Sequence, residues 1–297
     1  MTDLPSYDEL MAQARVAAAE VRPAPVEARG PAAPPNLRLR NTAIIAGGAA
    51  IIAGYGYHAW WRDGFTRDFR TQREGWFGRD TAFSGIDKLG HAYTGYFAVR
   101  AMAPLFEAVG NTPAQSRRLA AWTTWGTMSV MEVLDGFSRH YAFSREDFIA
   151  NTVGVVAGYA LASSPAWDDA IDFRLAYRRS PLSNFDPPGD YAGQRYHLAV
   201  KADGFAALRD VPILKYLELN VAYGAPGVDT PDEWRLHDFA QRRREVFLGV
   251  SVNLSRVLAD AFYGGARSTT RTQRAAELGF ELLQPPVTLQ RGRDLDR

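Results

Sequence analysis

The residues best suited to chemistry lie in three short segments between positions 87 and 151. Each segment holds two polar side chains three or four residues apart, a spacing that places both on one face of a helix. The pairs are Asp87 with His91, Glu132 with Asp135, and Asp147 with Asn151. Two cations, Lys88 and Arg145, stand beside the first and third pairs.

These side chains suit metal binding or acid–base catalysis. His91, Glu132 and Asp147 offer nitrogen and oxygen ligands for a divalent metal. His91 can also act as a general base oriented by Asp87 or Glu132, which makes these four residues the candidate catalytic groups. The candidate ligand-binding residues are Lys88, Asp135, Arg145 and Asn151. Their two cations suit an anionic head group such as phosphate.

Three helices are expected to position these groups, at about 86–108, 114–134 and 145–163. Consecutive helices joined by short loops pack antiparallel, so the start of the first, the end of the second and the start of the third meet at one end. Ser84 and Ser144 are expected to be N-caps. The spacing of Gly154 and Gly158 permits close helix packing. The expected helix ends thus bring the polar pairs together. The residues expected to wall the resulting pocket are Trp122, Trp125 and Ser129.

A purely structural interpretation stays open beside the functional one. Asp87 and Asp147 can serve as capping residues of their helices. His91, Glu132 and Asn151 can form a satisfied polar network that fixes helix register. No functional role is assigned to the remaining histidines, which are His58, His140, His197 and His237.

Composition excludes several function classes. The 34 basic residues nearly balance the 33 acidic ones, so no excess positive charge points to a nucleic-acid partner. The absence of cysteine excludes disulfides, thiolate metal sites, a cysteine nucleophile and a lipidated N-terminal cysteine. The sequence shows no Walker loop, dinucleotide fingerprint, HExxH motif or serine nucleophile motif. Whether the protein is an enzyme stays undecided, and the only cofactor suggested is a divalent metal.

The first half of the chain predicts an anchored helical bundle. Residues 1–40 form an Ala- and Pro-rich arm, expected to be disordered. Residues 41–61 carry no formal charge and lie between arginines and aromatic residues, which predicts a transmembrane anchor. A connector at 62–85 leads to the helical bundle at 86–165. Two topologies stay open, four membrane spans or a bundle on or beside the membrane.

The second half changes to a period of two, typical of half-buried strands. Strands are expected at 196–201, 217–223, 246–253 and 277–282, with a short helix at 255–263 and a loose tail at 285–297. The fold class predicted is a mainly α membrane-anchored bundle of about four helices, followed by a small antiparallel β-rich region at 190–284. These strands can form an open sheet or join a partner, either a second copy or another envelope protein.

The ordered motifs carry a resemblance to a known family. Asp-Lys-x-x-His at 87–91, Glu-x-x-Asp-Gly at 132–136 and Asp-x-x-x-Asn-x-x-Gly at 147–154 resemble the YfiM-like family of predicted envelope lipoproteins. A looser likeness holds to VanZ-like membrane proteins. The resemblance covers about residues 60–159 and implies an envelope location without implying an activity. The lack of cysteine departs from a lipoprotein, and the anchor at 41–61 is expected to replace the lipid.

The sequence therefore predicts an inner-membrane envelope protein whose polar pocket faces the periplasm, with membrane lipids as partners and a role in envelope maintenance or lipid handling. One alternative is a metal- or acid–base-dependent membrane enzyme acting on a phosphorylated lipid or glycan precursor. Another is an outer-membrane or assembly protein that uses the C-terminal strands.

Overall fold

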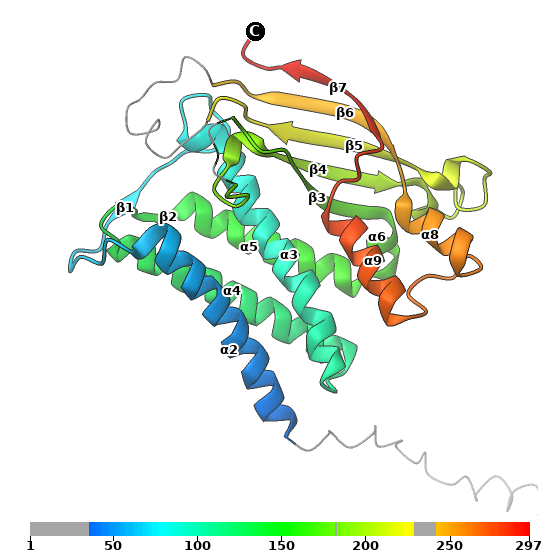
Figure 1. Ribbon diagram of the computed structural model, residues 1–297, viewed down its shortest axis with the longest axis horizontal. Helices are drawn as coiled ribbons and strands as arrows, with labels where there is room; N and C mark the ends of the chain where they lie inside the picture. The colour runs from blue at the N-terminus through cyan, green and yellow to red at the C-terminus, as the bar shows by residue number, and fades with distance from the viewer. Residues whose placement is uncertain (1–35, 182, 184, 229–241) are drawn as a thin grey trace, which may run out of the picture. The chain divides into compact units, whose positions relative to one another are not determined.

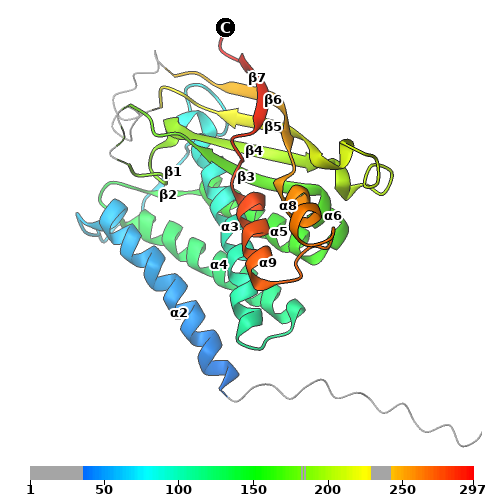
Figure 2. The same cartoon turned by 45° about the vertical axis from the view of Figure 1, so that its right-hand side comes forward.

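The computed structural model describes residues 36–181, 183, 185–228 and 242–297. Within these residues, a group of helices packs beside a five-stranded antiparallel sheet (Figures 1 and 2). The architecture is α+β.

The predicted membrane anchor, and with it the membrane-anchored fold class, is wrong. Residues 41–61 lie in α2 (Leu37–Gly56) and a following π-helical turn, η1 (Tyr57–Trp61). No helix in the described part of the chain combines the length and the apolar character that a bilayer span needs. The prediction relied on the absence of charged residues, but a membrane span also needs a strongly apolar segment. Residues 41–61 are instead rich in glycine, alanine and weakly polar residues.

Polar contacts tie α2 to its neighbours. The side-chain amides of Asn41 and Asn111 exchange hydrogen bonds of 3.0 and 2.7 Å. The Tyr55 hydroxyl donates to Asp186 Oδ1 at 3.0 Å. Of the expected N-terminal arm, residues 1–35 lie outside the described residues, and α2 begins within its last positions.

The three predicted site helices are confirmed as α3 (Ile86–Ala108), α4 (Pro113–Phe137) and α5 (Arg145–Ser163). Ser144 caps α5, because its hydroxyl accepts from the Asp147 amide at 3.2 Å. Ser84 is not a cap, since Gly85 precedes α3 in a left-handed conformation with φ 79°. A Cβ at Gly154 would lie 1.9 Å from the Ala92 carbonyl oxygen, so α3 and α5 meet backbone to backbone.

The sheet follows chain order, with each strand antiparallel to the next. Its strands are β3 (Ile171–Tyr177), β4 (Gln194–Lys201), β5 (Leu217–Gly224), β6 (Glu245–Val252) and β7 (Thr288–Asp294). The remaining helices are α6 (Pro165–Ala170), α8 (Leu254–Phe262) and α9 (Arg271–Leu282). A short parallel pair, β1 (Thr71–Gln72) with β2 (Phe143–Ser144), joins the connector to the start of α5.

Three of the four predicted strands are confirmed as β4, β5 and β6. The fourth is wrong, because residues 277–282 belong to helix α9. Leu278 and Leu282 are four residues apart and both pack in the core, so a short alternating run concealed a helical face. Residues 288–294, expected to be loose, form the edge strand β7.

The core between helices and sheet is largely aromatic. The Tyr93 ring of α3 lies 5.5 Å from both Phe173 of β3 and Tyr196 of β4. Tyr96 packs against Phe173 at 5.7 Å. These contacts anchor α3 to one edge of the sheet and hold its N-terminal turns in place.

Candidate functional site

The start of α3, the end of α4 and the start of α5 lie at the same end of the helices, and their polar side chains are in contact. His91 Nδ1 lies 3.0 Å from Asn151 Oδ1 and 3.5 Å from Glu132 Oε1. Asn151 Nδ2 donates to Glu132 Oε1 at 3.1 Å. Because the amide oxygen of Asn151 must then accept, the Nδ1 atom of His91 carries a proton. Asn151 thus orients both the imidazole and the carboxyl group.

Lys88 forms the second half of this cluster. Its Nζ lies 2.8 Å from Asp87 Oδ2 and 2.6 Å from Asp147 Oδ1. Its third partner is Glu74, from the connector before α3. Asp147 links the two halves, because its Oδ1 also lies 3.8 Å from His91 Nε2. We call the seven residues the helix-end cluster: Glu74, Asp87, Lys88, His91, Glu132, Asp147 and Asn151.

Glu74 is a member that the sequence analysis missed. It lies in an irregular segment, where no helical spacing marks it. The parallel pairing of Gln72 with Ser144 draws the connector against the start of α5. Ser144 Oγ then donates to Glu74 Oε2 at 3.3 Å. The contact depends on a pair of strands of two residues each. Strands this short cannot be recognised in a sequence.

Three predicted ligand-binding residues have other surroundings. The Lys88 side chain is 1% exposed and surrounded by carboxyl groups. The Arg145 side chain is 57% exposed and contacts Glu146 at 3.5 Å, outside the cluster. Asp135 Oδ1 accepts a hydrogen bond of 2.7 Å from Trp61 Nε1. The two cations therefore do not form a joint site for a phosphate group.

Burial and charge shift the protonation of the cluster strongly. Burial raises the pKa of Glu132 to about 8, against the opposing effect of His91. Burial, reinforced by Asp147, raises the pKa of Glu74 to about 8. Burial disfavours the charged imidazole, but Asp147 and Glu132 outweigh it and raise the pKa of His91 to about 9. The raised pKa values favour a cationic His91 and protons on the two glutamates near neutral pH.

The two aspartates of the cluster shift in opposite directions. Burial raises the pKa of Asp87 above its usual value. Burial acts on Asp147 in the same sense, but His91 and Lys88 outweigh it and lower the pKa of this carboxyl group. Asp147 is therefore the anion that the two cations share. At the rim, burial raises the pKa of Asp135 to about 6.

Two groups of side chains in the cluster have the spacing of metal ligands. Ligand atoms of His91, Glu132 and Asp147 all lie within 4.8 Å of one another. The same holds for Glu74, Asp87 and Asp147, but the Lys88 ammonium lies among those carboxyl groups. Ligands about 2.1 Å from a tetrahedral ion are roughly 3.4 Å apart, so the first group needs only a small inward movement of side chains. The His91 side chain is 20% exposed, which gives this group access to solvent.

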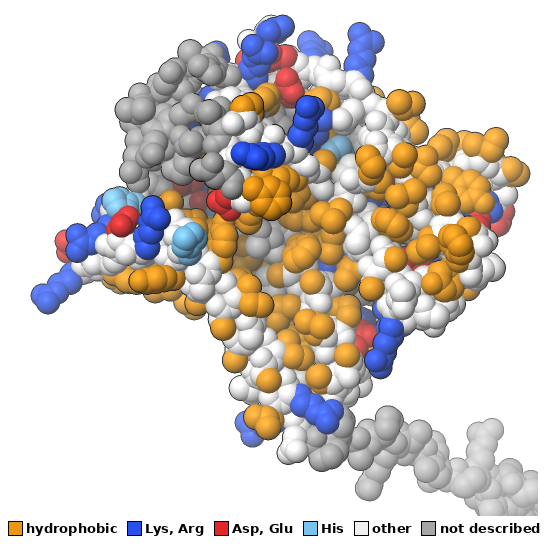
Figure 3. Space-filling view, in the orientation of Figure 1, with side chains coloured by type: hydrophobic (Ala, Val, Ile, Leu, Met, Phe, Trp, Pro, Cys, Tyr) orange, Lys and Arg blue, Asp and Glu red, His pale blue; other side chains and the backbone are white. Residues whose placement is uncertain are grey.

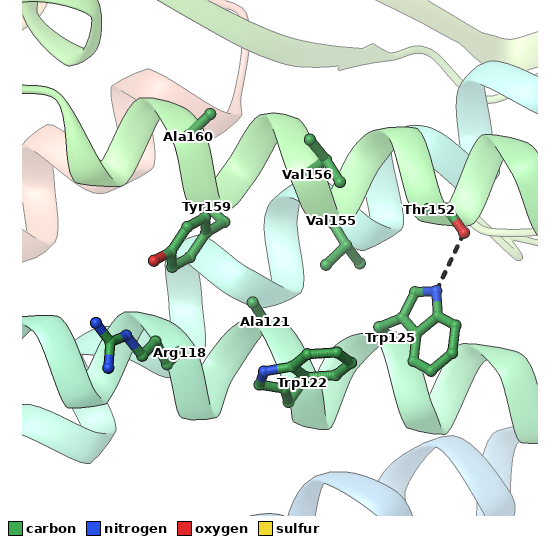
Figure 4. A pocket seen from close by; sticks show the side chains of 9 residues that line it. All are labelled: Arg118, Ala121, Trp122, Trp125, Thr152, Val155, Val156, Tyr159 and Ala160. Carbon is green, nitrogen blue, oxygen red and sulfur yellow. Dashed lines mark hydrogen bonds between the residues drawn. The ribbon is translucent and has the colours of Figure 1, made fainter.

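A groove lies between α4 and α5 on the surface of the helices. Its volume is about 580 Å³, and Trp122, Trp125, Val156 and Tyr159 provide much of its lining (Figure 4). Trp125 Nε1 donates to Thr152 Oγ1 at 3.1 Å at one end, and Arg118 stands at the other (Figure 4). The two tryptophans expected to wall a pocket thus line this groove, whereas Ser129 does not. Hydrophobic side chains also spread widely over the neighbouring helix surfaces (Figure 3).

Comparison with protein families gives a match over part of the chain. Residues 73–163 match the family described as Predicted periplasmic lipoprotein (DUF2279). Searches of curated proteins and of solved structures give no significant match. The family match supports the expected likeness to envelope lipoproteins, although it confirms neither the YfiM-like nor the VanZ-like relationship. The matching segment holds every residue of the helix-end cluster and is similar to envelope proteins of unknown function.

Proposed function

We propose that this chain is a periplasm-facing envelope protein that binds a divalent cation through His91, Glu132 and Asp147. The observation that carries the proposal is the convergence of their ligand atoms within 4.8 Å. The three residues come from three different helices, whose ends are held by cap and core contacts. Ligands on packed helices are positioned more accurately than ligands on loops.

The balance of charged groups in the cluster favours a bound cation over a purely structural network. Four carboxyl groups, from Glu74, Asp87, Glu132 and Asp147, surround the two cations Lys88 and His91. The excess is relieved at neutral pH by protons held on the two glutamates. A divalent cation can replace such protons, because metal binding deprotonates its ligands.

Asn151 is the positioning residue of the proposed site. It contacts Nδ1 of His91 at 3.0 Å and the carboxyl group of Glu132 at 3.1 Å. Hydrogen bonds of this kind fix the ring orientation and basicity of metal ligands. A bound cation would supply Lewis-acid chemistry. Because the His91 side chain is partly exposed, one side of the cation would be open to solvent.

A second candidate function is hydrolysis of a phosphorylated lipid or glycan precursor at the same cluster. The groove between α4 and α5 favours it, because these two helices also carry Glu132, Asp147 and Asn151 of the cluster. Its volume of about 580 Å³ falls within the range of small-molecule sites. Release of inorganic phosphate from such a precursor by the wild type, and not by His91→Ala, would support this candidate over binding alone.

The binding proposal can be tested by titrating chelator-treated protein with Zn²⁺ in a calorimeter. We expect one site in the wild type and at least about tenfold weaker binding in Glu132→Gln, because a charged ligand is lost. Glutamine can still accept the Asn151 hydrogen bond, so the fold is retained. Glu146→Gln is the matched control, since Glu146 is a buried glutamate of α5 whose ion pair is with Arg145 and not with a ligand residue. Failure of the wild type to bind Zn²⁺, or equal affinity in wild type and Glu132→Gln, would reject the site.

A further inference from the structure

The two faces of the sheet differ sharply in polarity. Successive residues of a strand point to opposite faces, and paired residues on adjacent strands share a face. One face carries the register row Val200–Leu219–Val250–Leu289 and the row Leu198–Val221–Leu248–Arg291. We call this surface the apolar sheet face. Its exposed aliphatic residues are Leu198, Leu219, Val221, Leu248, Val250 and Leu289.

The exposure of these six side chains is high for a sheet, at 41–83%. Helix α3 lies on this face, where Tyr93 and Tyr96 pack against Phe173 of β3 and Tyr93 also against Tyr196 of β4. The part formed by β5, β6 and β7 stays open beside it. Contiguous exposed apolar surface of this kind marks an interaction site.

The opposite face of the sheet is polar and buried. Arg174 donates to Glu218 at 2.9 Å, and the Lys201 ammonium contacts Asp172 at 2.7 Å, all with side chains at most 2% exposed. On this face the polar groups pair with one another and are buried, whereas the polar face of most antiparallel sheets is turned to water. The six exposed aliphatic residues of the apolar sheet face lie outside the aromatic core that α3 forms with Phe173 and Tyr196 of the same face.

The charge on the apolar sheet face indicates what covers it. Arg291 and Arg293 of β7 lie on this face, opposite Leu248 and Val246, and both are exposed. All residues of this face on β4 to β7 are described, and none is acidic. An anionic surface would complement these arginines. A second copy of the chain would bring the same two cations and no carboxylate to the contact.

The types of side chain on the apolar sheet face also favour a lipid surface over a protein partner. Protein interfaces are enriched in aromatic side chains at their centre, whereas the exposed residues here are leucine and valine. Aliphatic residues with flanking arginines suit the interfacial region of a bilayer, where arginines reach phosphate groups. We propose that the apolar sheet face docks on the surface of an anionic phospholipid bilayer.

The test is co-sedimentation of the purified chain with phosphatidylcholine vesicles, with and without phosphatidylglycerol. We expect binding to the anionic vesicles that weakens with salt. Arg291→Gln with Arg293→Gln should weaken this binding roughly 30-fold, at about 1 kcal/mol for each arginine. Leu219→Gln with Leu248→Gln should weaken it at least about tenfold. The matched controls, Ile213→Gln and Arg271→Gln, replace exposed residues outside the strands of the sheet and should bind as the wild type does.

Three outcomes would overturn the proposal. The first is no binding of the wild type to anionic vesicles. The second is equal loss of binding in the leucine variants and in Ile213→Gln. The third is a dimer in solution that the leucine variants dissociate while vesicle binding is unchanged, which would assign the face to a second copy. Circular dichroism of every variant would check that the fold is intact. Zn²⁺ binding would test the helix-end cluster independently.

Discussion

Replacement of the buried Lys88 by methionine tests whether this cation stabilises the fold or serves to bind a ligand. Methionine keeps much of the side-chain volume but leaves Asp87, Asp147 and Glu74 without their shared cation. Removing one partner of a buried ion pair costs about 3–5 kcal/mol, because an uncompensated charge stays buried. We expect a loss of that size in the free energy of unfolding of Lys88→Met near pH 8.

The loss should shrink in acid. Without Lys88, the pKa values of the buried carboxyl groups rise further, so the folded variant binds more protons than its unfolded chain. The folded state therefore gains stability as pH falls, and urea unfolding followed by circular dichroism should show a smaller difference from wild type at pH 5 than at pH 8. Adding Asp87→Asn should restore part of the stability, because one unpaired carboxyl group is removed.

Lys215→Met is the matched control for this experiment. Lys215 contacts Asp260 at 2.6 Å, but both side chains are partly exposed to solvent. Solvent screening leaves such a pair little influence on stability, so the control should lose much less than Lys88→Met. A loss of less than about 1 kcal/mol in Lys88→Met at pH 8, or a loss that does not decrease at pH 5, would refute the proposed role of Lys88.

Two further predictions concern packing and protonation. Gly154→Ala should destabilise the protein by about 1–3 kcal/mol or more, because its Cβ would meet a carbonyl oxygen of α3 at 1.9 Å. Gly279→Ala, whose Cβ meets nothing within 4 Å, should be neutral or stabilising, and similar melting temperatures of the two variants would contradict the close α3–α5 contact. Metal-free wild type should lose stability between about pH 5 and pH 9, since the folded chain holds protons with pKa values of about 8 on Glu74 and Glu132 and about 9 on His91. A flatter profile is expected for Glu132→Gln in urea unfolding, and a wild-type stability that rises over this range would show that these groups are not held protonated.

The helices and the meeting of their ends could be predicted because the information is local. Spacings of three and four residues define a helical face, and short loops make consecutive helices antiparallel. His91, Glu132 and Asn151 come together on that basis. Glu74 could not be predicted, because its position depends on the two-residue pairing of β1 with β2.

Other features depend on quantities that local patterns do not reveal. The segment at 41–61 lacks charge without being sufficiently apolar, so counting charges predicted an anchor that the described helices do not provide. The alternation in the sheet was recognised, but not which face is buried. Which face is buried depends on contacts between strands that are distant in sequence. Arg174 and Glu218, for example, are 44 residues apart.

The central claim, that the helix-end cluster exchanges protons for a divalent cation, is tested most directly by counting those protons. Zn²⁺ binding at pH 7 would be measured by calorimetry in two buffers that differ in ionisation enthalpy. The pKa values of about 9 for His91 and about 8 for Glu132 predict release of about two protons for each ion bound. Binding without proton release, or no binding, would contradict the claim.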